Sequence, residues 1–171
     1  MDLLDRMLGH DRWTTALLLE MCRGLTDVQL DQPFDIGHRT LRRTFGHMIS
    51  AVRFWTAAMT GQPEEMREDE RALAVLSEEH ERSYAAFAAL ARRMHDEGRM
   101  DETFIDWYGW PKSIGGTILN VPLHNERHRG DVLHILQRLG VSGLPDGDPQ
   151  EWEYATKVVE PIVDVDPQLR R

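Results

Sequence analysis

The sequence is poor in the residues that stabilise secreted proteins and in those that bind nucleic acids. Cys22 is the only cysteine in 171 residues, so the chain can form no internal disulfide and no multi-cysteine zinc site. Its 20 basic and 29 acidic residues give a net charge of −9, which repels phosphate backbones and anionic lipids. The longest uninterrupted apolar run, at 84–91, is far shorter than the ~20 residues of a membrane span. The N-terminus has no basic n-region and no small-residue cleavage site. We therefore expect a cytoplasmic protein with neither a nucleic-acid nor a membrane partner.

Lysine is also scarce. Lys112 and Lys157 are the only two lysines, against 18 arginines. The arginines are scattered along the chain rather than gathered at one site. We therefore interpret them as codon bias in a GC-rich genome rather than as an anion-binding surface.

The periodicity of the apolar residues, which make up 41% of the chain, predicts a single all-α domain over residues 1–171. Apolar positions recur every three or four residues at 2–23, 40–60, 68–97 and 113–139, which predicts four long helices. Aromatic and β-branched residues at 102–110 predict a short strand or extended excursion before the fourth helix. Four amphipathic helices favour a four-helix bundle with its core at about 3–140.

Two features modify this outline. Pro122 lies inside the fourth range, so that helix is either kinked there or begins regularly only at the proline. The segment 141–171 is rich in Pro, Gly and Asp and reads as a C-terminal extension. Asp148 followed by Pro149 predicts a short helix near 149–157 within it, and the last dozen residues are expected to run extended.

Among the eight histidines, the spacing of His124 and His128 points to metal binding. Four residues apart on a helix, their imidazoles share one face, which suits two ligands of one ion. His47 is the best candidate for a third ligand and His10 the second candidate. The alternative is that these are ordinary core or surface histidines, since such pairs are common on helices. His80 and His95 lie among charged residues and are expected at the surface.

Several motifs together resemble the DinB/YfiT-like superfamily of metal-binding four-helix bundles. They are His10-Asp-Arg-Trp13, Leu25-Thr-Asp-Val-Gln-Leu-Asp, Thr44-Phe-Gly-His47 followed by Trp55, and His124-Asn-Glu-Arg-His128-Arg-Gly-Asp131. The resemblance covers residues 3–140. It implies an up-down-down-up bundle that is frequently a homodimer, and it assigns His47, His124 and His128 as the metal ligands.

The sequence departs from the family pattern beside the expected ligands. Asp131 stands where the family commonly has Gln, Arg127 stands where His is frequent, and Pro122 precedes the first ligand of the pair. The Asp131 carboxylate has three possible roles: orienting an imidazole N–H, contacting a metal-bound water, or pairing with Arg127.

Three histidines would leave a divalent ion, most readily Zn²⁺ or Ni²⁺, with its full charge and an open position. Relatives that this chain resembles use such a site to activate a small thiol cofactor. The resemblance therefore implies a metal-dependent transferase or isomerase that acts on a small-molecule substrate. A metal-dependent hydrolase and a non-enzymatic metal- or ligand-binding stress protein are the alternatives.

Asp11 and the apolar surface raise two further expectations. Asp11 falls on the apolar face of the first helix, so it either pairs with Arg53 or Arg129 or acts in the site as a base or substrate-orienting group. Cys22 falls on the same apolar face and reads as a core residue. Leu133, Trp107, Trp110 and the tail 158–163 are apolar where a simple bundle should be polar, which predicts a homodimer.

Overall fold

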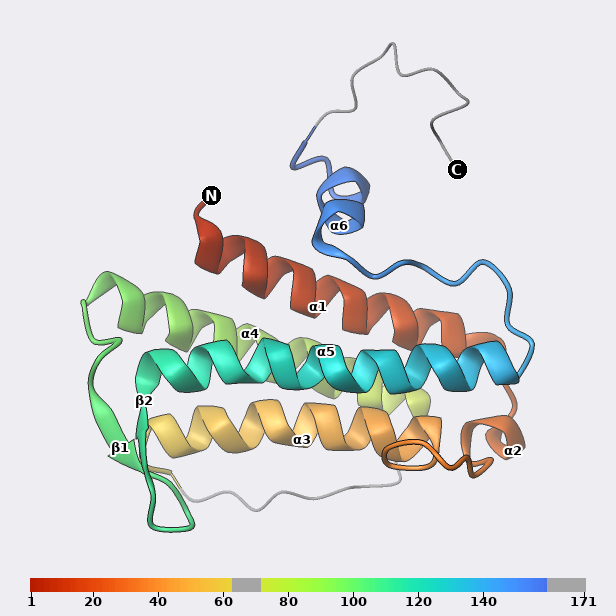
Figure 1. Cartoon of the computed structure of the whole chain (residues 1–171), viewed down its shortest axis with the longest axis horizontal. Helices are drawn as coiled ribbons and strands as arrows, with labels where there is room; N and C mark the ends of the chain where they lie inside the picture. The colour runs from red at the N-terminus through yellow and green to blue at the C-terminus, as the bar shows by residue number, and fades with distance from the viewer. Residues whose placement is uncertain (63–71, 160–171) are drawn as a thin grey trace.

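The computed structural model describes residues 1–62 and 72–159, and four long helices form its framework (Figure 1). They are α1 (Leu3–Met21), α3 (Leu41–Met59), α4 (Leu73–Asp96) and α5 (Ile114–Arg138). The shorter elements are η1 (Cys22–Gly24), α2 (Asp27–Leu30), β1 (Thr103–Ile105), β2 (Pro111–Ser113) and α6 (Pro149–Ala155). The predicted helical class is confirmed, and each long helix lies where the periodicity placed it. Positions 68–71 of the third predicted helix lie outside the described residues.

Polar side chains fix where the long helices begin. At three of the four starts, a side chain accepts a hydrogen bond from the N–H three residues on, as the best N-caps do: Asp2 at α1, Thr40 at α3 and Ser113 at α5. From Ser113 onward, α5 continues through Pro122 without interruption. The alternative that this helix begins only at the proline is therefore wrong.

The main contacts among the four long helices run between one pair, α1 and α3, and the other pair, α4 and α5. Both α1 and α3 pack against α4 and against α5. The colours of Figure 1 show that α1 and α5 run from left to right, whereas α3 and α4 run from right to left. No helix of the described ranges is long and apolar enough to cross a membrane.

The apolar core has two parts, one toward each end of the framework. One is centred on Tyr84 and Phe87 of α4, and the other on Phe45 of α3 and Ile135 of α5. Leu133 is half-buried and packs against the second part. Its apolar character is thus explained by the core, and the interpretation of Leu133 as uncovered surface is wrong.

A β-hairpin and the C-terminal extension lie at the edges of the bundle. Strand β1 pairs antiparallel with β2, with Phe104 opposite Lys112, so the predicted extended stretch is one arm of a hairpin. The turn leaves Trp107 and Trp110 more than half exposed. The predicted short helix is present as α6, and its Trp152 packs closely on Gly9 of α1, where any side chain would overlap the indole. Residues 160–163 and the extended run predicted for the last dozen residues lie outside the described ranges.

A buried ion pair joins α1 to α5. Asp11 is fully buried and pairs with Arg129, whose exposed fraction is 2%. Asn125 adds a hydrogen bond from its Nδ2 to Asp11 Oδ2 at 2.9 Å, and Glu126 pairs with the other side of the Arg129 guanidinium. Of the two arginines considered for Asp11, the structure therefore has Arg129. The pairing explains how a carboxylate is accommodated on the apolar face of α1.

We predict that Asp11→Ala lowers the free energy of unfolding by about 3–5 kcal/mol, because it leaves the Arg129 charge buried without its main partner. The matched control is Asp5→Ala on the same helix, since Asp5 pairs with Arg92 at the exposed surface. That substitution should cost much less, because an exposed ion pair contributes little to stability. Urea unfolding of both variants measures the difference, and equal losses would show that the buried pair has no special importance.

Candidate metal centre

Four histidine rings meet between α3, α5 and the loop that precedes α3. Nε2 of His47 faces Nε2 of His124 at 3.0 Å. The ring centroid of His128 lies 4.8 Å from that of His47 and 4.5 Å from that of His124. The three residues assigned as a triad therefore lie together, from two different helices. Their role as metal ligands stays a prediction.

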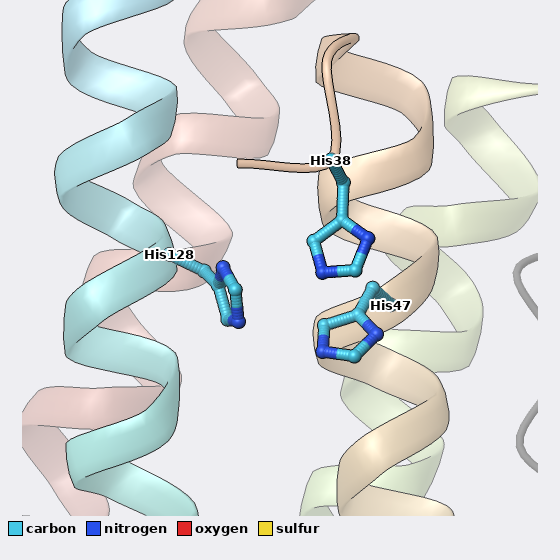
Figure 2. Close-up of side chains that lie close together, drawn as sticks. All are labelled: His38, His47 and His128. Carbon is cyan, nitrogen blue, oxygen red and sulfur yellow. The ribbon is translucent and has the colours of Figure 1, made fainter. Parts of the chain in front are cut away.

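His38 is the fourth ring, and it was not among the residues predicted for the site. Figure 2 shows it directly beside His47, with His128 facing both from α5. The His38 ring stacks on that of His47 with centroids 3.8 Å apart. One ligand atom from each of His38, His47 and His128 lies within 4.8 Å of the others, close enough to hold one ion. The only signal in the sequence was the place of His38 after Gly37 and just before a helix cap.

The conformation of the loop before α3 carries His38 to the cluster. Gly37 and Arg39 have positive φ values of 45° and 75°, so the chain turns sharply on both sides of His38. The loop is closed by a hydrogen bond from Phe34 N–H to the Arg39 carbonyl at 2.7 Å. Gly37 lies against the carboxylate of Asp131, where a β-carbon would overlap the oxygen. The loop and α5 are therefore in direct contact beside the site.

Asp131 lies behind His128 rather than in the middle of the cluster. Nδ1–H of His128 donates to Oδ2 of Asp131 at 3.2 Å. A carboxylate on one ring nitrogen fixes the tautomer and leaves the other nitrogen, Nε2, for a ligand bond. Of the three roles considered for Asp131, this geometry favours orientation of the imidazole. The catalytic role assigned to Asp131 stays a prediction.

The other residues considered for the site lie elsewhere. His10, the second candidate for the third ligand, donates from Nε2 to the Gly147 carbonyl at 2.7 Å and so holds the C-terminal extension. The carboxylate of Asp11 is engaged by Arg129 and Asn125. Its assignment as a base or substrate-orienting group is untested, but this pairing favours the structural alternative.

Cys22 and His80 are both buried. Cys22 is buried as expected, and burial raises the pKa of its thiol to about 12. His80 was expected at the surface, but it is 2% exposed, and its Nε2 donates to the Arg12 carbonyl at 3.0 Å. That surface expectation for His80 is wrong because its partner comes from another helix.

Burial and mutual repulsion favour the neutral forms of His47, His124 and His128. The pKa of His47 is lowered to about 3, first by burial and then by the charges that His38, His124 and His128 would carry. Burial likewise lowers the pKa values of His124 and His128. At neutral pH these rings carry lone pairs rather than charges. Neutral imidazoles are good ligands for Zn²⁺, Ni²⁺ and related ions, so the residues present fit a divalent metal.

We predict that the metal-free protein loses stability as the pH falls from about 6.5 toward 3. The folded pKa values of His47, His124 and His128 lie below the unfolded value, so unfolding takes up protons in this range. The histidine contribution is therefore fully present above about pH 6.5 and is lost on acidification. His47→Gln should reduce the dependence by about 1.4 kcal/mol per pH unit between about pH 4 and 6.

Chemical unfolding at a series of pH values measures this dependence. The control is His95→Gln, since His95 is exposed at the end of α4 beside Asp96. An unchanged pH dependence in His47→Gln would show that His47 is not held neutral by the fold.

Comparison with known proteins identifies the family. The family model described as "DinB family" matches residues 1–156. The structure is similar to the crystal structure of a DinB-like protein from Bacillus cereus ATCC 10987, with a TM-score of 0.60 and 21% identity over 80% of this chain and 91% of that chain. At this identity the likeness shows the fold alone. No significant match was found among curated proteins. The chain thus belongs to the DinB family.

Proposed function

We propose that this protein binds one divalent metal ion through His47, His124 and His128 and uses it to activate a small thiol in a transfer or isomerisation reaction. The observation that carries the proposal is the approach of three mostly buried imidazoles from two rigid helices, with two Nε2 atoms 3.0 Å apart. At that distance the two nitrogens form an N–H···N hydrogen bond when one Nε2 carries a proton, and they can bind one shared ion when neither does. A metal between the rings would explain why the fold holds them there.

The surrounding residues support a reactive site rather than a closed structural one. A metal ion held by neutral imidazoles lowers the pKa of a bound thiol or water and polarises a carbonyl. Asp131 holds the His128 ring in one tautomer and so directs Nε2 toward the centre. Cys22 is buried with a strongly raised pKa, which makes it a poor source of thiolate. The thiol in this proposal therefore comes from a separate small molecule.

In this proposal His38 is not a resident metal ligand, unlike the three helical histidines. It comes from a loop with two positive-φ residues, whereas His47, His124 and His128 project from helices packed in the core. Groups on rigid elements hold ligand geometry more closely than groups on loops. We therefore assign the resident ligands to the helices and place His38 at the position that an incoming thiol would take.

The first test is metal content. After loading with Zn²⁺, Ni²⁺ or Co²⁺ and gel filtration, the wild type should retain about one ion per chain. His47→Ala and His128→Ala should each lower the affinity by at least about tenfold, because each removes one of three ligands. His38→Ala should retain the ion, and so should the exposed control His95→Ala. Equal metal content in wild type and His47→Ala would exclude His47 as a ligand.

The second test is thiol binding to the cobalt-loaded protein. Addition of 2-mercaptoethanol should produce a thiolate–cobalt absorption band in the wild type and in Cys22→Ser, because the thiol is external. His38→Ala should bind the thiol more tightly, since the competing imidazole is gone. If the metal is retained and no thiol binds in either protein, thiol activation is contradicted. Hydrolysis by a metal-bound water would then be the better-supported function.

We also propose that the family's up-down-down-up bundle and its homodimer apply here. The directions of the helices in Figure 1 support the bundle order. The dimer is supported by apolar side chains that the described chain leaves more than half exposed: Trp107, Trp110, Leu119 and Leu123. Light scattering at micromolar concentration should give twice the mass of 19.8 kDa, and a monomeric mass would contradict the dimer.

A further inference from the structure

A cavity of about 560 Å³ lies between the β-hairpin and the first half of α5. Its walls include Trp55 of α3, Asp106 and Tyr108 of the hairpin turn, Lys112 of β2, and Thr117 and Asn120 of α5. None of these residues has a part in the histidine cluster. The volume is in the range of small-molecule sites, which are commonly about 300–1,000 Å³.

The cavity and the histidine cluster are built on the same two helices. Asn120 precedes His124 by four residues, so the cavity wall on α5 ends about 6 Å from that ligand along the helix axis. On α3, Trp55 follows His47 by eight residues, or about 12 Å. Figure 1 shows the hairpin at one end of the α3–α5 pair and the loop before α3 at the other. From the start of α5, next to Lys112, to His124 is about 15 Å along the helix axis, so a molecule that spans from Lys112 to the cluster is about 15 Å long.

Aromatic rings give the cavity an apolar wall. Phe54 packs edge-on against Trp55 at 5.0 Å and against Trp107 of the hairpin turn at 6.5 Å between centroids. These contacts hold the hairpin turn against α3 beside the cavity. Tyr108 lines the cavity although its side chain is 78% exposed, so it is available to cover a bound molecule. Flat aromatic walls of this kind favour a ligand with a planar, apolar body.

A lysine and an aspartate form an ion pair at the cavity wall. The Lys112 ammonium lies 3.6 Å from Oδ2 of Asp106. Asp106 is committed to the turn, because its Oδ1 accepts N–H bonds from Tyr108 at 3.0 Å and Trp110 at 2.9 Å. One carboxylate oxygen thus organises the hairpin while the other holds Lys112 at the wall. An ammonium has three N–H donors, so Lys112 can bind an anionic group while it keeps this contact.

We propose that this cavity binds the aromatic carboxylate end of the substrate, with the ring between Trp55 and Tyr108 and the carboxylate on Lys112. The reacting end of that substrate then lies toward the histidine cluster. That orientation of the reacting end rests on the proposed function, whereas binding of the aromatic carboxylate does not need the metal. The hairpin thereby becomes the element that selects the substrate.

The binding test compares 2-naphthoate with the uncharged 2-naphthamide by calorimetry on metal-free protein. Lys112→Gln should weaken naphthoate binding about three- to tenfold and leave naphthamide unchanged, because only the carboxylate meets the ammonium. Trp55→Leu should weaken both. Lys157→Gln removes the only other lysine, outside the cavity, and should change neither. Equal naphthoate affinity in the two lysine variants would overturn the assignment of Lys112.

Lysine acetylation gives an independent readout of the same site. Because the chain has only two lysines, peptide mass analysis reports Lys112 and Lys157 separately. Naphthoate should slow acetylation of Lys112 and leave that of Lys157 unchanged. Equal protection of both lysines, or of neither, would contradict binding in the cavity.

A longer probe tests whether the cavity leads to the cluster. 4′-(Mercaptomethyl)biphenyl-4-carboxylate should bind more tightly to cobalt-loaded than to metal-free protein and produce the thiolate–cobalt band. Lys112→Gln should then require a higher probe concentration for the same band. If naphthoate binds but the probe binds cobalt-loaded and metal-free protein with equal affinity, the proposal that the substrate extends to the cluster is overturned. A failure of the proposed function itself would appear separately, as a loss of metal retention in the wild type.

Discussion

The contact on which the site most depends is the buried ion pair between Asp11 and Arg129. Arg129 and its neighbour in this network, Asn125, each follow directly after a histidine of the cluster on α5. Consecutive residues on a helix point about 100° apart. When the face with Asn125 and Arg129 is held against Asp11 of α1, the face with His124 and His128 is turned toward α3. A charge that must stay paired inside the core thus sets the rotation of the helix that carries two of the histidines.

The loop before α3, which carries His38, forms the other side of the cluster. His38 is placed by two positive-φ residues and by the close approach of Gly37 to Asp131, not by helix packing. Because Asp131 also binds the His128 ring, one carboxylate joins the loop to His128 of α5. Any displacement of the loop therefore changes the surroundings of His128 as well as of His38.

The helices and the His124–His128 pair could be predicted from the sequence because helical spacing fixes which residues share a face, whereas His47 was assigned through the resemblance to the family. What the sequence could not supply were contacts between distant elements. His38 was missed because the conformation of its loop, not a repeat, brings it to His47. His80 was placed at the surface from its charged neighbours in the sequence, but its partner is a carbonyl of α1. The choice between Arg53 and Arg129 for Asp11 likewise depended on helix packing.

The electrostatics of the chain link the candidate metal site to the class of substrate. The protein is strongly acidic overall, with a net charge of −9, yet burial lowers the pKa values of His47, His124 and His128 and so favours their neutral forms. Among the described residues, the Asp131 carboxylate contacts the Nδ1 of His128 rather than the centre of the cluster. A divalent ion held by neutral ligands keeps its positive charge, whereas carboxylate ligands would cancel it. Within an acidic surface, such an ion and the Lys112 ammonium, which lies in β2 directly before α5, would be two positive points about 15 Å apart along the axis of α5. In the proposed reaction, that arrangement would suit the thiolate of the small thiol at the ion and a carboxylate of the substrate at Lys112.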